Sequence, residues 1–331
     1  MIERWSQLSP LDQLCDELGV RPSARFTGGE KIDLNHNPVD EFSAGDGIKP
    51  KFNMFLVEDS HRTKFNLKIG NFNDREAEQT NHLRQLATDN KLFRVPQVKR
   101  EEPGRYILFE HLKGMPVSRE KFWKQPDLME KVFETLSSID GLLNQAPLEK
   151  DEADNGREWV AQKLSNNDEK GWIKPILADA ELTRSDLINE NFIDQVQTYT
   201  QRHQSELNDM VRIWRDPNGD HLIVPYDSLE HRMGVVDIDI TTRPRHYVPM
   251  RFLAWTLLKI DDEKLSLETW VNQIRAGYGL TGADKEPTFV LSLTGILYDL
   301  ATGERDNKNK RLIAVEVKNI INQIIKLDES R

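Results

Sequence analysis

Cysteine is almost absent from this chain: Cys15 is the single one among 331 residues. One thiol excludes an internal disulfide framework, and this usage suits a reducing compartment. No apolar run approaches the roughly 20 residues that span a bilayer, and the segment Met1–Trp5 is polar and acidic, unlike a signal peptide. We therefore expect a cytoplasmic protein with no membrane partner.

Basic residues are also outnumbered, with 45 Lys and Arg against 55 Asp and Glu and a net charge of -10. Broad nucleic-acid binding requires a basic surface, so we expect no nucleic-acid partner. Cys/His finger spacings, Gly-x-Ser-x-Gly, Gly-x-Gly-x-x-Gly and Gly-Lys-Ser/Thr motifs are missing too. A hydrophobic content of 37% with 30% charged residues is typical of a globular protein with an ample core.

The first third of the chain is rich in strand patterns. A helix is expected at Pro10–Leu18, where Gly19 ends it. Residues 25–110 then read as strand, strand, helix, strand, strand. The segments are Phe52–Val57, Thr63–Ile69, Asp74–Leu86, Val95–Lys99 and Arg105–Glu110.

After Gly114 the pattern changes to helices. Pro126–Asn144 carries apolar residues at i, i+3 and i+4 spacing. The acidic segment Glu149–Gly156 is expected to be an exposed loop. Further helices are expected at Glu158–Leu164, Phe192–Val211, Val248–Leu258, Leu267–Tyr278 and Leu312–Leu327.

Two carboxylates stand out in the segment Trp214–Asp239. Asp216 lies in a polar loop, a short apolar run follows, and Asp237 closes the β-branched run Val235–Val236. Phosphoryl transfer uses such a layout: one Asp accepts the proton of the attacking hydroxyl, and a second holds the Mg²⁺ that bridges the nucleotide phosphates.

This stretch resembles the His-Gly-Asp-x-His-x-x-Asn loop and the later Ile-Asp-Trp motif of the aminoglycoside phosphotransferase and choline kinase family. Asp216 and Asp237 match the two aspartates of the family. The first His, the Gly, the second His and the Asn of the family are replaced by Trp214, Arg215, Asn218 and His221.

The resemblance covers roughly residues 40–260 and implies an α+β, bilobal, protein kinase-like fold. Residues 1–112, with the N-terminal helix, would form a nucleotide-binding lobe of a small sheet plus a helix. Residues 113–331 would form a mainly helical C-terminal lobe that carries the catalytic loop and the substrate site.

The resemblance also implies nucleotide-binding residues in the first lobe. Asn66–Gly70 resembles the strand whose lysine contacts phosphates, here Lys68, and Arg75–Ala77 resembles the helix whose glutamate, here Glu76, pairs with that lysine. A glutamate near a helix N-terminus also suits the macrodipole. The alternative is a solvated edge-strand lysine and a surface glutamate.

Tyr106–Pro116 resembles the family's hinge, whose backbone can pair with an adenine edge; here that assigns Glu110, His111 and Leu112. An ordinary strand followed by a glycine turn is the alternative. Ser43, Gly45 and Gly47 form a candidate loop that covers the phosphates, because small residues let backbone amides approach. Thr27–Gly29 is an equal competitor, and a plain loop is equally compatible.

In the catalytic loop the resemblance makes Asp216 the base, with Arg215 beside it, and Asp237 the metal ligand. His221 takes the position of a metal-binding Asn, although hard cations prefer oxygen to imidazole. Asp239 would face the same side as Asp237 if the strand continued. An Asx turn at Asp216, or pairing of the later carboxylates with a nearby arginine, is the structural alternative. Other candidates for these roles are Asp220 and Asp227 for the metal, and Arg232, Arg243 and Arg245 for the pairing.

The implied function is ATP- or GTP-dependent, Mg²⁺-assisted phosphorylation of a hydroxyl on a small molecule such as an aminoglycoside, a choline-like alcohol or a sugar. The alternative is a pseudokinase that senses nucleotide or acts as a scaffold, motivated by Trp214, His221 and Arg251. Protein phosphorylation is less favoured, since Asp-Phe-Gly and Ala-Pro-Glu motifs are missing. Nothing in the sequence encodes the substrate or the oligomeric state.

Overall fold

A computed structural model describes most of the chain in two compact units. The first consists of Met1–Pro116 and Asp220–Asp239, and the second of Val117–Gly219 and Ile240–Arg331. The described residues are 10–27, 30–32, 52–70, 75–117, 126–165, 168, 170–215, 217, 219–226, 231–248, 252, 286–302 and 310–330. The expected division into 1–112 and 113–331 remains a prediction about functional lobes.

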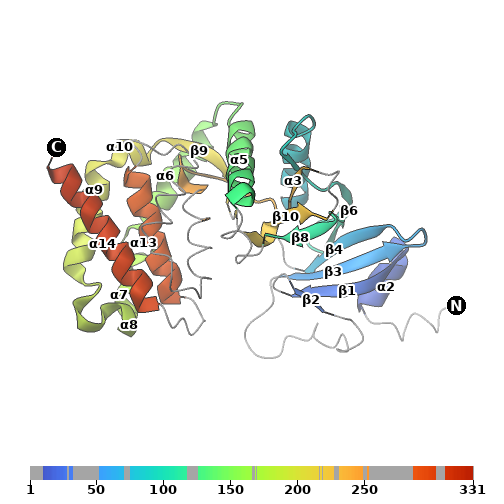
Figure 1. Cartoon of the computed structure of the whole chain (residues 1–331), viewed down its shortest axis with the longest axis horizontal. Coiled ribbons are helices and arrows are strands. Elements are labelled where there is room, and N and C mark those ends of the chain that lie inside the picture. The colour runs from blue at the N-terminus through green and yellow to red at the C-terminus, as the bar shows by residue number, and fades with distance from the viewer. Residues whose placement is uncertain are drawn as a thin grey trace. The chain divides into compact units, whose positions relative to one another are not determined.

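The first unit contains an antiparallel sheet of six strands in the order β2-β1-β3-β4-β7-β6 (Figure 1). Its strands are β1 (Val20–Thr27), β2 (Glu30–Ile32), β3 (Phe52–Asp59), β4 (Lys64–Gly70), β6 (Val98–Glu102) and β7 (Tyr106–Glu110). The expected hairpin is the β3–β4 pair, in register from Phe52 opposite Gly70 to Glu58 opposite Lys64. Its turn is held by Asp59, whose Oδ1 accepts from the amides of His61 and Thr63.

Helix α2 (Pro10–Leu18) packs on one face of this sheet, as the sequence predicts. Leu11, Leu14 and Cys15 of the helix are buried against apolar side chains of the strands. Gly19 ends the helix at φ +69°, a left-handed conformation that costs glycine little.

Helix α3 (Glu76–Leu86) covers the other face of the sheet, where Ala77 packs on Ile107 and Phe109. Side chains alternate along a strand, so Ile107 and Phe109 point away from the face on which Leu108 meets the α2 cluster. Lys68 lies opposite Ile107 in the β4–β7 register and therefore belongs to the α3 side.

A second sheet of the first unit has four short strands in the order β5-β11-β10-β8. Its strands are β5 (Phe93–Arg94), β8 (Gly114–Pro116), β10 (Leu222–Pro225) and β11 (Met233–Val235). Gly114 is required here, because a Cβ at this position would collide with the carbonyl oxygen of Val224. The sheet thereby joins residues that are far apart in the sequence.

The second unit is mainly helical, with one two-stranded ribbon of β9 (Met210–Trp214) and β12 (Ile240–Pro244). Its helices are α5 (Pro126–Leu143), α6 (Lys150–Lys163), α7 (Ile173–Ala178), α8 (Ala180–Thr183), α9 (Glu190–Arg202), α10 (Gln204–Leu207), α13 (Glu286–Thr302) and α14 (Lys310–Glu329), with 3-10 turns η3 (Arg184–Asp186) and, at the border of the units, η4 (Gly219–His221). Helix α13 is central, since α7, α9, α10 and α14 all pack against it (Figure 1). Helices α5 and α14 agree with the sequence prediction.

Two sequence predictions for this unit are wrong. The segment Glu149–Gly156 is the start of α6, where Glu149 and Glu152 form a reciprocal capping box, rather than a loop. The expected helix Phe192–Val211 ends at Arg202, and its last residues enter β9 instead. The ladder from Met210 to Trp214 pairs with β12, and this tertiary pairing outweighs the local helical pattern.

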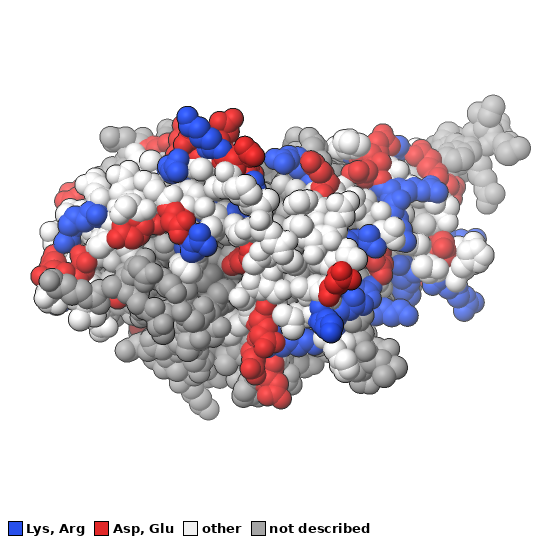
Figure 2. All heavy atoms as spheres, turned by 90° about the horizontal axis from the view of Figure 1, so that it is seen from above, with Lys and Arg blue, Asp and Glu red and all other residues white. Residues whose placement is uncertain are grey.

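The predicted helices Val248–Leu258 and Leu267–Tyr278 lie almost wholly outside the described residues. Within the described ranges no helix is long and apolar enough to cross a bilayer. Acidic and basic side chains are interspersed on the face of the molecule in Figure 2.

Candidate active site

The first unit buries an ion pair between a strand and a helix. Lys68 on β4 is 2% exposed, and its Nζ lies 2.6 Å from Oε2 of Glu76, the first residue of α3. Strand β4 lies between β3 and β7, and Glu76 is itself 4% exposed. The alternative of a solvated edge-strand lysine and a surface glutamate is therefore wrong.

A second carboxylate reaches the same ammonium group from 169 positions along the chain. Oδ1 of Asp237 lies 2.8 Å from Lys68 Nζ, and Oδ2 of Asp237 lies 3.2 Å from Nε2 of His221. Lys68, Glu76, His221 and Asp237 all belong to the first unit. The structure thus brings together four of the residues singled out in the sequence.

The main chain around Asp237 explains how the carboxylate is aimed. Strand β11 ends at Val235, and Asp237 adopts φ 57°, so the expected alternation with Asp239 does not operate here. The amide of Val236 donates to the carbonyl oxygen of His221 at 3.0 Å, which fixes η4 beside this turn. A left-handed aspartate is uncommon and costs about 1 kcal/mol, so the conformation is held by its surroundings.

The charges of this cluster shift each other's protonation. Burial disfavours the Lys68 ammonium, but Asp237 and Glu76 outweigh it and hold the pKa of Lys68 above its ordinary value. Burial raises the pKa of Glu76 to about 7, although Lys68 opposes the shift. Burial also opposes ionisation of Asp237, yet His221 and Lys68 keep its pKa below the ordinary value. The surroundings therefore favour the ionised form of Asp237 and disfavour the ionised form of Glu76.

The predicted hinge residues are Glu110, the last residue of β7, and His111 and Leu112, which follow it. Two of their side chains form hydrogen bonds with other parts of the protein. Glu110 accepts from Arg94 Nη2 at 2.5 Å and from the amide of Gln97 at 3.2 Å. Nδ1 of His111 lies 3.1 Å from Oδ1 of Asn66. Leu112 is buried and its Cδ1 lies next to Gly234. The side chains of Glu110 and His111 thus hold this segment against its neighbours in the first unit.

The sequence did not lead us to expect Asn66 and Arg94 as partners of His111 and Glu110. Asn66 stands two residues before Lys68 on the same face of β4, so strand alternation gave a usable signal. Arg94 contacts Glu110 across the fold, and no local pattern predicts that pair.

Several other predicted site residues lie outside the described residues, namely Asp216, Ser43, Gly45, Gly47 and Arg251. Arg215 is exposed at the end of β9 in the second unit, and Asp239 is half-buried in the first. Trp214 is fully buried on β9, opposite Ile240, and is a core residue. Within the described ranges, no three His, Cys, Asp or Glu side chains form a group that could hold a metal ion. A hard cation fits the Asp237 carboxylate better than the His221 imidazole.

Comparison with known proteins gives no match to a family model and none among curated proteins. Solved structures do match over nearly the whole chain. An amicoumacin kinase in complex with AMP-PNP, Ca²⁺ and Ami is 10% identical, with 97% of this chain and 95% of that chain covered and a TM-score of 0.54.

The ADP-bound aminoglycoside phosphotransferase APH(2'')-Ib is 13% identical, with 95% and 98% covered and a TM-score of 0.51. A choline kinase from Streptococcus pneumoniae is 10% identical, with 98% and 99% covered and a TM-score of 0.50. At this identity the likeness establishes the fold. The chain has the α+β, protein kinase-like fold of these small-molecule kinases, and the expectation from the sequence is confirmed.

Proposed function

We propose that this protein is a phosphotransferase that uses ATP or GTP to phosphorylate a hydroxyl group of a small molecule. The observation that carries the proposal is the buried arrangement of Lys68 between Glu76 and Asp237. Kinase catalysis relies on positioning and charge stabilisation, and a lysine held by a glutamate next to a metal-binding aspartate supplies both.

In this proposal each residue has a separate role. Glu76 holds Lys68 extended, and the ammonium neutralises nucleotide phosphate oxygens. Asp237 holds Mg²⁺, which supplies further charge neutralisation at the phosphates when bound. Asp216 orients the acceptor hydroxyl and accepts its proton, with Arg215 beside it. The backbone at Glu110, His111 and Leu112 receives the nucleobase, and Ser43, Gly45 and Gly47 cover the phosphates.

A second candidate is a pseudokinase that binds nucleotide without transferring phosphate. Trp214 favours it: where the resembling family has a catalytic-loop histidine, this chain has a fully buried indole. His221 and Arg251 depart from that family as well. Both candidates require nucleotide binding, and only the first requires transfer.

Calorimetry with ATP or GTP plus Mg²⁺ tests what the two candidates share. We expect binding by the wild type, and loss of metal-dependent affinity in Asp237→Ala. Asp154→Ala, which removes an exposed carboxylate of α6, serves as the matched control. Lack of binding by the wild type, or full affinity of the Asp237 variant, would refute the assignment of this site.

Transfer is then tested by ADP release with a panel of hydroxylated amines, antibiotics and sugars. Asp216→Asn keeps the shape of the side chain but cannot accept the proton. We expect it to bind nucleotide normally and to lose about 10² to 10⁴ in rate. Binding without transfer to any acceptor would favour the pseudokinase.

A further inference from the structure

His221 is held beside Asp237, the candidate metal ligand, by one side-chain contact and by the main chain next to both residues. Its side chain is 18% exposed, and Nε2 lies 3.2 Å from Oδ2 of Asp237. On the main chain, its carbonyl oxygen accepts from Val236, and the next residue, Leu222, pairs with Val235 in the β10–β11 ladder. The relative position of the two residues is therefore set by the sheet.

The chemistry of the contact fixes its direction. An ionised carboxylate only accepts hydrogen bonds, so the ring nitrogen that faces Asp237 must carry a hydrogen. This holds for the neutral ring and for the imidazolium alike. A nitrogen that carries a hydrogen has no lone pair for a metal, so Nε2 is a donor in this arrangement and not a ligand.

The two oxygens of Asp237 are held from two sides. Lys68 Nζ contacts Oδ1, and His221 Nε2 contacts Oδ2. An ionised carboxylate can accept several hydrogen bonds, so both donors can be accommodated at once. These two donors therefore fix the orientation of the carboxylate plane.

We infer that His221 is a positioning residue, which donates from Nε2 to Asp237 and orients that carboxylate toward the metal of the nucleotide complex. The inference rests on the proposed function and departs from the sequence prediction that His221 is itself a ligand. Groups that orient a metal ligand in this way typically alter metal affinity about 10- to 100-fold when removed.

Rescue by a second donor separates positioning from simple packing. His221→Phe removes the donor and keeps a ring, and we expect Mn²⁺-nucleotide affinity to fall about 10-fold. His221→Gln can still donate from its amide nitrogen, and we expect most of the affinity to return. His82→Phe, at an exposed site on α3, is the control. Thermal unfolding of each variant shows whether a loss of affinity reflects a loss of fold.

Electron spin echo modulation of the Mn²⁺-nucleotide complex distinguishes a positioning residue from a ligand. We expect the spectra of the wild type and His221→Gln to agree, with no nitrogen coupling assigned to a directly bound imidazole. A coupling that disappears only in the His221 variants would overturn the inference. Equal affinity of wild type and His221→Phe would also overturn it, yet would leave the proposed function intact. If the wild type binds no Mn²⁺-nucleotide at all, the proposed function fails as well.

Discussion

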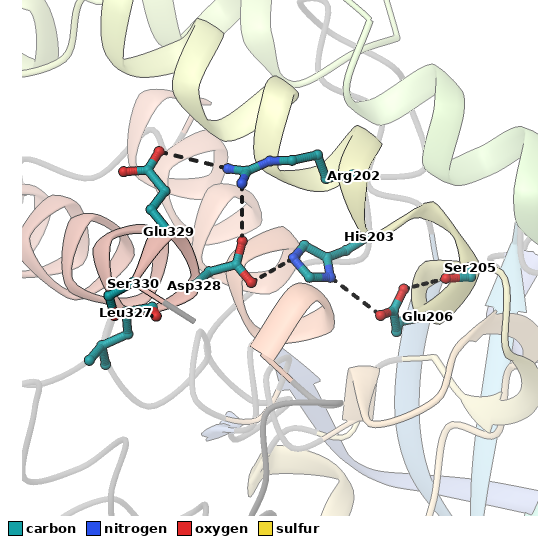
Figure 3. A network of polar contacts seen from close by, with 8 residues as sticks. All are labelled: Arg202, His203, Ser205, Glu206, Leu327, Asp328, Glu329 and Ser330. Atoms are coloured by element: carbon teal, nitrogen blue, oxygen red, sulfur yellow. Dashed lines mark hydrogen bonds and ion pairs between the residues drawn. The ribbon is translucent and has the colours of Figure 1, made fainter.

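Nε2 of His203 lies 3.0 Å from Oδ1 of Asp328, and this contact joins the end of α9 to the last turn of α14 (Figure 3). The other ring nitrogen, Nδ1, lies 3.3 Å from Oε1 of Glu206. Carboxylates only accept, so both hydrogen bonds form together only when the ring carries two hydrogens. The network therefore selects the imidazolium form of His203.

The charges around this ring are mixed. Arg202 pairs with Asp328 at 3.3 Å and approaches Glu329 at 3.8 Å. Burial and the negative charge of Glu286 raise the pKa of the nearby Tyr199, whose ring centroid is 4.7 Å from that of His203. Burial opposes protonation of His203, but Asp328 and Glu206 outweigh it and raise its pKa. A histidine whose pKa is raised on folding stabilises the fold fully below its unfolded pKa of about 6.5, and this contribution is lost as pH rises through the folded pKa.

The first prediction concerns His203→Gln. We expect the variant to unfold at a temperature about 2 °C lower than the wild type at pH 5.5, because it loses about 1 kcal/mol of charge-assisted hydrogen bonding. The difference should shrink by pH 9, and thermal unfolding followed by circular dichroism at both pH values measures it. His82→Gln is the control. A difference that does not change with pH would show that the ring is not charged in the fold.

A second prediction follows from Asp140 on α5. Its buried Oδ1 has no hydrogen-bond partner among the described residues, and burial raises the pKa of the carboxyl to about 8, against the opposing charge of Arg245. The folded state therefore keeps a proton that the unfolded chain releases near pH 4. Stability should fall by up to about 1.4 kcal/mol per pH unit from pH 4 toward pH 8 through this group.

Asp140→Asn should remove that part of the pH dependence. Urea unfolding at pH 5 and pH 7.5 measures it, and we expect the variant to gain relative to the wild type at the higher pH. Asp154→Asn, on the surface of α6, should leave the profile unchanged. If the free energy of unfolding changes with pH in the same way in the wild type and in Asp140→Asn, Asp140 does not have a raised pKa.

The third prediction concerns the ion-pair cluster as a structural element. Lys68→Met leaves Glu76 and Asp237 without their shared ammonium, and we expect the free energy of unfolding to fall by about 3 kcal/mol. Because burial already raises the pKa of Glu76 to about 7, Glu76→Gln should recover part of this loss in the double variant. Urea unfolding of both variants measures the coupling. Lys64→Met, at an exposed position of β4, is the control. If the free-energy changes of Lys68→Met and Glu76→Gln simply add in the double variant, the two residues are not coupled.

A fourth prediction compares two glycines within helices. Gly141 on α5 is exposed and has nothing within 4 Å of an added Cβ, so Gly141→Ala should stabilise the protein by about 0.5 to 1 kcal/mol. Gly156 on α6 is buried, and its Cβ would lie 2.8 Å from Met210 Sδ and 3.1 Å from Thr242 Cγ2. We expect Gly156→Ala to destabilise by about 1 to 3 kcal/mol despite the better helix propensity. Chemical unfolding of both variants measures the change in the free energy of unfolding. A change of the same sign in both would contradict the prediction.

Local patterns predicted the elements that are amphipathic on their own. Helices α2, α5 and α14 and the β3–β4 hairpin show periodic apolar residues, and the structure has them close to the expected bounds. Helix α13 was not predicted, because every residue of the run Phe289–Leu293 is buried and the run has no helical period to detect. The start of helix α6 was not predicted for the opposite reason, because its first turns are polar and resemble a loop.

The candidate site was predictable only in part for a similar reason. Lys68 late in a strand and Glu76 at a helix start are local signals, and the resemblance added Asp237. The contact between His221 and Asp237 depends on the φ of 57° at Asp237 and on the β10–β11 ladder. No single segment encodes that geometry, so it emerges only when distant strands pair.

The pairing of β8 with β10 has a consequence for synthesis of the chain. Ile223 lies opposite Pro116, yet the whole segment Val117–Gly219 is translated between them. A nascent chain released up to Gly219 contains Lys68 and Glu76 but neither of the strands that bring Asp237 to them. Strands β5 and β8 therefore lack their partner strands in this sheet while the intervening helices are translated. The contact between Lys68 and Asp237 can form only after β10 and β11 have been translated and have paired with β8 and β5.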